Sequence, residues 1–253
     1  MEILFYSLSG AAVGLIIGLT GVGGGALMTP LLLMFGFPAH IAIGTDLWYA
    51  AITKSGGMVA HHRRGHVRWP IVALMAAGSL PAAALTGLML FFFFRQPEHY
   101  ASILQTTLGV MLVTTAAVLI FRNRLSRRLH SRQQVHHPIL IWLVGVVLGF
   151  LVTLSSVGAG AIGTAVLMML FPMLMPKEIV GTDIAHAVPL TLTAGLVHLF
   201  LGNVDFALLA ALILGSLPAI YIGTSLSARL PARIMHPLLA TALLLLGLKY
   251  AVF

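Results

Sequence analysis

Long apolar runs separated by short polar segments dominate the chain. The runs lie at about 4–36, 39–60, 69–94, 100–121, 138–172, 178–200, 204–226 and 232–252. A helix needs about 20 apolar residues to cross the hydrocarbon core of a bilayer, so runs of this length predict membrane spans. The pattern therefore predicts an all-α integral membrane protein with about eight spans.

Two of these runs are interrupted by glycine. The runs at 4–36 and 138–172 are too long for one straight crossing, because a helix rises only about 1.5 Å per residue. Residues 21–25 read GVGGG, and residues 155–160 read SSVGAG. Glycine disfavours the interior of a helix, so each run is predicted to form two shorter helices joined at a break, as a helical hairpin.

Three short motifs occur twice. They are Gly-Thr-Asp at 44–46 and 181–183, Gly-X-Val at 65–67 and 202–204, and Gly-Ser-Leu-Pro at 78–81 and 215–218. All three share an offset of about 137 residues, and the glycine breaks correspond at an offset about two residues shorter. We therefore expect two pseudo-symmetric repeats, at 1–121 and 138–253, joined by a basic cytoplasmic linker at 122–137. Each repeat would hold a glycine-broken hairpin and three transmembrane helices.

The distribution of basic residues bears on the orientation of the repeats. If the broken element turns back within the membrane, the repeats are inverted, with about eleven basic residues on the cytoplasmic face and about two outside. If it crosses fully, the division is about nine against four. Because cytoplasmic loops are enriched in Lys and Arg, the distribution favours inverted repeats.

Composition narrows the classes of function. Of the 253 residues 59% are hydrophobic and only 8% charged, which is too little polar surface for a soluble domain. The net charge of +8 does not indicate nucleic-acid binding, because most basic residues lie in loops between apolar runs. With no cysteine and six acidic residues spread singly, the sequence predicts no thiolate metal site, no paired-carboxylate enzyme site and no resident cofactor.

The glycines at the two breaks are candidate ligand-binding elements. Broken helices within a bilayer expose backbone N–H groups, and these groups together with the helix dipoles suit an anion near the membrane midplane. Gly23, Gly24 and Gly25 with Gly158 and Gly160 would donate those hydrogen bonds. The alternative is that glycine merely lets membrane helices pack closely.

The repeated Thr-Asp pairs have two interpretations. Thr45-Asp46 and Thr182-Asp183 would each open a helix after a short break, where the side chains cap free N–H groups. The functional interpretation is that Asp46 and Asp183 lie beside the substrate cavity and couple transport to protons, since ionisable residues within a membrane are functional candidates.

Lys54 and His186 are further ionisable residues within apolar runs. Lys54 lies eight residues after Asp46 on about the same helix face, where it binds substrate or an acid, or else extends toward the basic loop. Its counterpart in the second half is Thr191. His186 follows Asp183 by three residues and is a candidate proton carrier, although single membrane histidines often only bond a neighbouring helix.

Several motifs resemble the TauE/SafE family of membrane transporters. Residues 14–30 read GLIIGLTGVGGGALMTP, residues 42–45 read AIGT, and residues 63–67 form the basic turn RRGHV. The resemblance extends over nearly the whole chain and both halves. Asp46 departs from the family pattern, in which serine is frequent at this position.

The resemblance implies a multi-pass permease of the bacterial inner membrane that moves sulfite, sulfonates or related small sulfur-containing anions, usually outward and without ATP. The glycines at the breaks would then be backbone donors in its anion site. The residues expected to line the path are Thr45, Asp46, Lys54, Thr182, Asp183 and His186.

Two other classes of function compete with an anion transporter. A divalent metal-cation permease would use Asp46, Asp183 and His186 as ligands, although the nearby Lys54 opposes a bound cation. A membrane enzyme would need a nucleophile beside a base, and no such constellation is found in the sequence. The expected partners are therefore a small anion and the lipid bilayer, and the sequence leaves a homodimer open.

Overall fold

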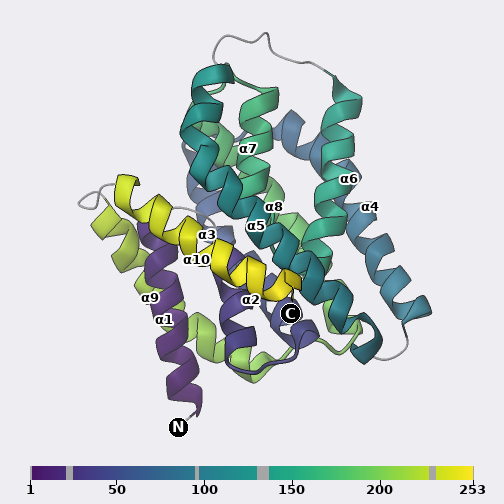
Figure 1. The fold of residues 1–253 in the computed structure, drawn as a ribbon. Helices are drawn as coiled ribbons and strands as arrows, with labels where there is room; N and C mark the ends of the chain where they lie inside the picture. Colours follow the sequence, from purple (N-terminus) through teal and green to yellow (C-terminus); the bar gives the residue numbers. More distant parts are fainter. Residues whose placement is uncertain (1, 21–24, 95–96, 130–136, 228–231, 253) are drawn as a thin grey trace.

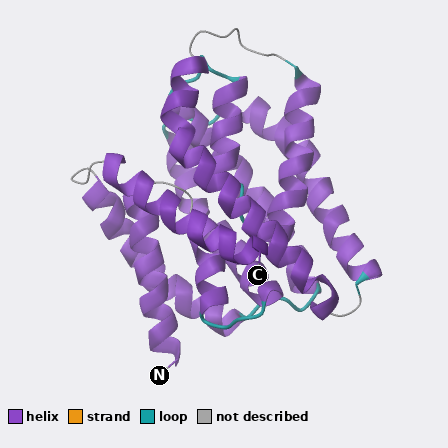
Figure 2. Ribbon diagram, viewed as in Figure 1, coloured by secondary structure: helices purple, strands orange, loops and turns teal. Residues whose placement is uncertain are grey.

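The structure, a computed structural model of the chain, describes residues 2–20, 25–94, 97–129, 137–227 and 232–252. All regular secondary structure in these residues is helical (Figure 2). The helices are α1 (Glu2–Thr20), α2 (Gly25–Met34), α3 (Ala39–Arg63), α4 (Trp69–Phe93), α5 (Pro97–Leu129), α6 (Pro138–Ser155), α7 (Ala161–Leu170), α8 (Pro176–Phe200), α9 (Phe206–Ser227) and α10 (Ala232–Val252) (Figure 1). The all-α prediction is confirmed for the described part of the chain.

Five of the described helices are long and apolar enough to cross a membrane. They are α4, α5 between His99 and Phe121, α6, α8 and α9 up to Leu226. The helices α1, α7 and α10 contain shorter apolar stretches. Helix α3 has the same 25-residue length as α4 but is less apolar, because it carries Asp46, Lys54 and several histidines.

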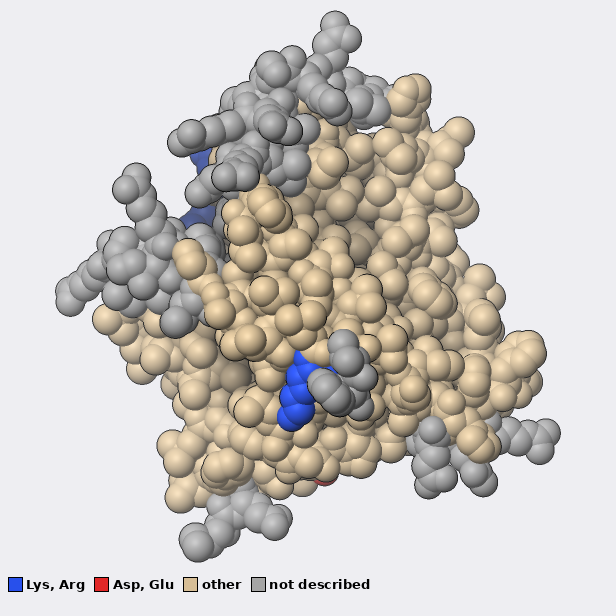
Figure 3. Space-filling view, viewed as in Figure 1, with Lys and Arg blue, Asp and Glu red and all other residues tan. Residues whose placement is uncertain are grey.

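The outer surface is largely apolar. The face drawn in Figure 3 shows few charged side chains among the described residues. Large apolar side chains are exposed along most helices, including Phe91, Phe92 and Phe93, of which Phe93 is 77% exposed. Such a surface would aggregate in water, whereas it suits contact with lipid.

The helices of the two halves pack reciprocally. Helix α1 packs along α9, and its counterpart in the second half, α6, packs along α4, the counterpart of α9 (Figure 1). Helices α3 and α8 pack on one another, as do α5 and α10. Every one of these pairs joins one half to the other, so each half completes its packing only against its counterpart.

Close approach at glycine occurs at matching positions in the two halves. A Cβ atom at Gly14 on α1 would lie 2.6 Å from the carbonyl oxygen of Ser216 on α9. A Cβ atom at Gly149 on α6 would likewise overlap the carbonyl oxygen of Ser79 on α4. Small residues let membrane helices approach closely, so the same α1–α9 contact is built a second time between α6 and α4.

The second apolar run is divided at the predicted position. Helix α6 ends at Ser155 and α7 begins at Ala161. Between them Ser156, Gly158 and Gly160 have φ values of 59°, 125° and 139°, which favour glycine and turn the chain. The predicted break in the first half includes Gly23 and Gly24, which lie outside the described residues, and Gly25 is the first residue of α2.

The linker predicted at 122–137 begins within helix α5, and the division of the chain into two repeats and a linker stays a prediction. Helix α5 continues without interruption to Leu129, so the first part of the 122–137 segment is helical. The apolar run ends near residue 121, whereas helical hydrogen bonding extends through the polar residues that follow because arginine and leucine are good helix formers.

Candidate functional site

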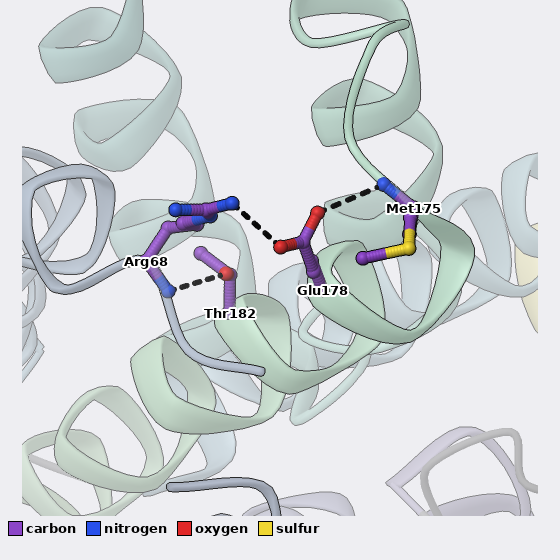
Figure 4. Close-up of polar contacts among 4 residues, drawn as sticks. All are labelled: Arg68, Met175, Glu178 and Thr182. Atoms are coloured by element: carbon purple, nitrogen blue, oxygen red, sulfur yellow. Dashed lines mark hydrogen bonds and ion pairs between the residues drawn. The ribbon is translucent and has the colours of Figure 1, made fainter. Parts of the chain in front are cut away.

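Two turns dock on the two central helices through the same backbone contact. The turn after α3 approaches α8, where the backbone N–H of Arg68 donates to Thr182 Oγ1 at 3.0 Å (Figure 4). The turn after α8 approaches α3, where the backbone N–H of Asp205 donates to Thr45 Oγ1 at 3.1 Å. Thr45 and Thr182 are both fully buried.

These contacts correct the capping interpretation of the Thr-Asp pairs. Helix α3 begins at Ala39 and α8 at Pro176, so both threonines lie about two turns inside their helices. The helices begin early because a proline stands at each start, with its φ fixed at a helical value or its ring ahead of the first turn. The threonine hydroxyls therefore bind the turns of the opposite half.

Asp46 joins the two halves at the centre of the molecule. Its side chain is fully buried on α3, and its Oδ2 accepts hydrogen bonds from Thr29 Oγ1 on α2 and from Ser156 Oγ at 3.0 Å. Ser156 belongs to the break between α6 and α7. Oδ1 of Asp46 has no hydrogen-bond partner among the described residues. Oδ2 thus has two hydroxyl donors, whereas Oδ1 is buried without a donor from the described residues.

Asp183 occupies the equivalent place on α8. Its Oδ2 accepts a hydrogen bond from Thr164 Oγ1 on α7 at 3.2 Å, as Asp46 does from Thr29. Its Oδ1 lies against Gly163, where a Cβ atom would overlap it, and has no hydrogen-bond partner in the described chain. Asp183 therefore has one hydroxyl donor where Asp46 has two.

Lys54 is buried between these acids. Only 7% of the residue is exposed, and Nζ donates to the carbonyl oxygen of Ala159 at 2.8 Å. Lys54 interacts electrostatically with Asp183 and, less strongly, with Asp46. No ion pair within 4 Å joins it to either acid in the residues that the structure describes. The side chain does not extend to the basic turn, so that alternative is wrong, and two ammonium donors remain for another acceptor.

In the break between α6 and α7, carbonyl oxygens are bonded to the first turn of α7, whereas several N–H groups have no acceptor among the described residues. The carbonyl oxygen of Gly158 accepts from Gly163 N at 3.0 Å, and that of Gly160 accepts from Thr164 N at 2.9 Å. No acceptor is found among the described residues for the N–H groups of Gly158, Ala159 and Gly160. Lys54 Nζ contacts this break at the carbonyl oxygen of Ala159, and the role of Gly158 and Gly160 as ligand donors stays a prediction.

His186 contacts Ser79 on α4, and no hydrogen bond joins it to Asp183 among the described residues. Its Nε2 lies 2.8 Å from Ser79 Oγ, and its Nδ1 has no hydrogen-bond partner in the described residues. It also experiences the charge of Lys54. The position equivalent to His186 in the first half is the buried Tyr49, so the ionisable residues around the centre differ between the halves.

Sequence reasoning missed the hydroxyl groups that hold the acids. Thr29, Thr164, Ser156 and Ser79 were not candidates, because hydroxyl residues are common in membrane helices and none stands out by itself. A signal was present, since Thr29 and Thr164 are related by the same offset as the glycine breaks. Among the described residues no group of three histidines or acids could hold a metal ion.

The fold and the central residues define a multi-pass helical membrane protein with buried ionisable residues on its central helices α3 and α8. The family described as sulfite exporter TauE/SafE matches residues 6–250, and the chain belongs to this family. The resemblance drawn from the sequence motifs is thereby confirmed.

The chain is also similar to curated proteins named as transporters. It is 40% identical to the probable membrane transporter protein YjnA of Bacillus subtilis over 247 residues, covering 96% of this chain and 97% of the relative. It is 28% identical to the probable membrane transporter protein YdhB of the same organism, over 86% of this chain and 87% of the relative. The probable membrane transporter protein MJ0441 of Methanocaldococcus jannaschii is 23% identical over 94% of this chain and 91% of its own length. No solved structure gives a significant match.

Proposed function

We propose that this protein is a secondary transporter of a small sulfur-containing anion, such as sulfite or an organosulfonate, in the bacterial inner membrane. The observation that carries the proposal is the buried Lys54, which has donors to spare and lies beside the unpaired amides of Gly158–Gly160. A small oxyanion offers several acceptor oxygens around one centre, which matches a cluster of amide and ammonium donors. Export is the direction that the family description supports.

Alternating access would arise from movement of one repeat against the other. We propose inverted repeats with eight membrane elements in all: each repeat has three full crossings and one broken hairpin that re-enters the membrane without crossing it. The reciprocal packing of α1 with α9 and of α6 with α4 supports a pseudo-two-fold relation. The basic turn Arg63–Arg68 and the polar end of α5 would then face the cytoplasm.

Coupling to protons is part of the proposal. Asp46, Asp183 and His186 each keep one buried polar atom without a partner in the described residues. A buried polar atom without a partner is costly, so such atoms in a transporter centre suit a ligand or an exchanging proton. Thr45 and Thr182 lie on the central helices directly before Asp46 and Asp183. They would transmit movement of the docked turns to these acids.

The substrate class can be tested by thermal shift on the purified protein in detergent. The panel is sulfite, thiosulfate, taurine, sulfoacetate, sulfate and cobalt, with Lys54→Ala beside the wild type. A ligand at about 100 times its Kd should stabilise the folded state by about 2.7 kcal/mol. We expect one sulfur oxyanion to raise the melting temperature of the wild type and to leave Lys54→Ala unchanged.

A matched control and the contrary outcomes complete the test. Lys249→Ala removes a lysine of α10 whose ammonium group lies over the ring of Tyr250, and it should keep the full response. Stabilisation by cobalt alone would overturn the anion site and favour the metal-cation permease. Equal responses of Lys54→Ala and the wild type to a sulfur anion would remove Lys54 from the site.

A further inference from the structure

We propose that one proton enters the central site with each monovalent anion, that Asp183 receives this proton, and that transport is therefore electroneutral. The inference rests on the proposed anion transport and adds its stoichiometry. Its basis is the arrangement of one buried lysine between two acids that lack equal support from their surroundings.

Charge balance is the first step of the argument. Lys54 on α3 faces Asp46 on its own helix and Asp183 on α8, and the other titratable groups facing these residues are Tyr49 and His186. A net charge buried in a low-dielectric interior is costly unless it is paired. The arrival of an anion must therefore be matched by the arrival of a cation, and a proton is the cation that carboxyl groups take up.

The surroundings of the two acids single out Asp183. Asp46 receives two hydroxyl hydrogen bonds, from Thr29 and Ser156, which support its charge whether or not Lys54 is occupied. Asp183 receives one, from Thr164, and its main counter-charge is Lys54. An anion that takes the ammonium group of Lys54 deprives Asp183 of more support than Asp46.

The exchange can be written so that charge is conserved. In the empty site the Lys54 ammonium balances the Asp183 carboxylate, and Asp46 keeps one protonation state throughout the cycle. The incoming monoanion binds the ammonium through the donors that Ala159 does not occupy, and one proton binds the carboxylate through Oδ1, which has no partner in the described residues. The site has the same net charge when empty and when loaded, so the anion and the proton together move no net charge across the membrane. Release reverses both steps.

Proteoliposomes containing the purified full chain provide the test. The probes are labelled methanesulfonate, which is a monoanion at any working pH, and labelled sulfite at pH 6. Three conditions are compared: an inward pH gradient, a potassium–valinomycin potential without a pH gradient, and counterflow against unlabelled internal anion. For the wild type we expect accumulation driven by the pH gradient, no accumulation driven by the potential alone, and counterflow.

Variants separate the inference from the function on which it rests. Asp183→Asn keeps an oxygen that can accept from Thr164 but cannot bind the proton, so accumulation driven by the pH gradient should fall at least tenfold while counterflow stays measurable. The matched control Asp205→Asn replaces an acid at the start of α9 by another good capping residue and should behave as the wild type. Its Oδ1 accepts from Leu208 N at 2.9 Å, and the backbone N–H that docks on Thr45 is unchanged by the substitution.

Each contrary result has a distinct meaning. Accumulation driven by the membrane potential, or pH-driven accumulation that survives in Asp183→Asn, would overturn this inference and leave the proposed anion transport intact. No flux of either probe under any condition would overturn the proposed function and this inference with it.

Discussion

The two docked turns have the same backbone contacts and different side-chain chemistry. Residues 64–68 dock on α8 and residues 201–205 dock on α3, each through a threonine hydroxyl that accepts a backbone N–H. At the first turn Arg68 adds an ion pair with Glu178 at 2.6 Å, and Glu178 also accepts from Met175 N (Figure 4).

At the second turn the corresponding support is neutral. Asn203 Nδ2 donates to the hydroxyl of Tyr100 at 2.9 Å and lies 3.1 Å from His198 Nδ1. His198 Nε2 faces the carbonyl oxygen of Thr153 at 2.9 Å, so Nε2 carries the proton and Nδ1 accepts. The network is complete without any charge.

The comparison separates what duplication retained from what it changed. The halves share the glycines and threonines on which backbone docking depends, and they differ in charge at Arg68 and Asp205, and at Lys54 and Thr191. Packing requires the same contact twice, whereas the two faces of a membrane and a single bound anion require a difference between the halves.

Substitution of Lys54, whose counterpart in the second half is Thr191, should have the largest effect on anion affinity. Lys54→Thr makes positions 54 and 191 the same and removes the buried ammonium group that would pair with the anion, a loss of about 2–5 kcal/mol in binding free energy, which is more than about tenfold in affinity. Binding of the anion identified by thermal shift would be titrated. Thr191→Ser is the control, and an affinity within threefold of wild type for Lys54→Thr would contradict the role of the lysine. The double variant Lys54→Thr, Thr191→Lys should recover part of the loss if the centre is pseudo-symmetric.

A methyl group at a docking glycine should have the next largest effect. The Cβ of Gly44→Ala would overlap the carbonyl oxygen of Asn203 and displace the second turn, lowering the free energy of unfolding by about 2–3 kcal/mol. Gly56→Ala on the same helix meets nothing within 4 Å and should be neutral or stabilising by up to about 1 kcal/mol. Unfolding in detergent micelles measures both, and equal effects would show that the docking is not tight.

Removal of the docking hydroxyls tests whether the two contacts are equivalent. Thr45→Val and Thr182→Val keep the shape of the side chain and leave a backbone N–H without its acceptor, at a cost of about 1–3 kcal/mol each. We expect the two losses of unfolding free energy to agree within about 0.5 kcal/mol. Thr114→Val on the exposed face of α5 serves as the control. A large difference between Thr45→Val and Thr182→Val would refute the equivalence of the turns.

Substitution of the side chains that differ between the turns should lower the free energy of unfolding least. The two losses should differ in their dependence on salt concentration. Arg68 is 52% exposed, so Arg68→Gln should lower the free energy of unfolding by less than about 1 kcal/mol, and the loss should vanish in high salt. Tyr100→Phe removes a buried hydrogen bond to Asn203 and should cost about 1 kcal/mol at every salt concentration. A salt-dependent loss in Tyr100→Phe would be inconsistent with a neutral network.

Much of the fold followed from the spacing of residues in the chain. The apolar runs, the division after Ser155 and the duplication are local or periodic features, which a sequence displays directly. The role of Thr45 and Thr182 did not follow, because their acceptance of amides from turns about 114 and 160 residues away depends on tertiary packing.

The candidate site was predictable in its charged residues and not in their partners. An acid or a lysine within an apolar run is conspicuous because burial of charge is costly, so Asp46, Lys54 and Asp183 could be selected from the sequence. Which hydroxyl supports which acid depends on how α2 and the break before α7 lie against α3 and α8. That inequality between Asp46 and Asp183 appears only in three dimensions.

The reciprocal packing of the halves also has a consequence for biosynthesis. Helix α1 packs against α9, which is synthesised about 200 residues later. At ordinary rates of translation this delay is on the order of 10–40 s. During this interval the glycine face of α1 has no native partner in the bilayer. A ribosome that stops after α5 leaves a half whose first and fourth helices could be covered only by a second copy of itself. Two separately expressed halves should therefore assemble into a working protein, because each half supplies the helices that the other packs against.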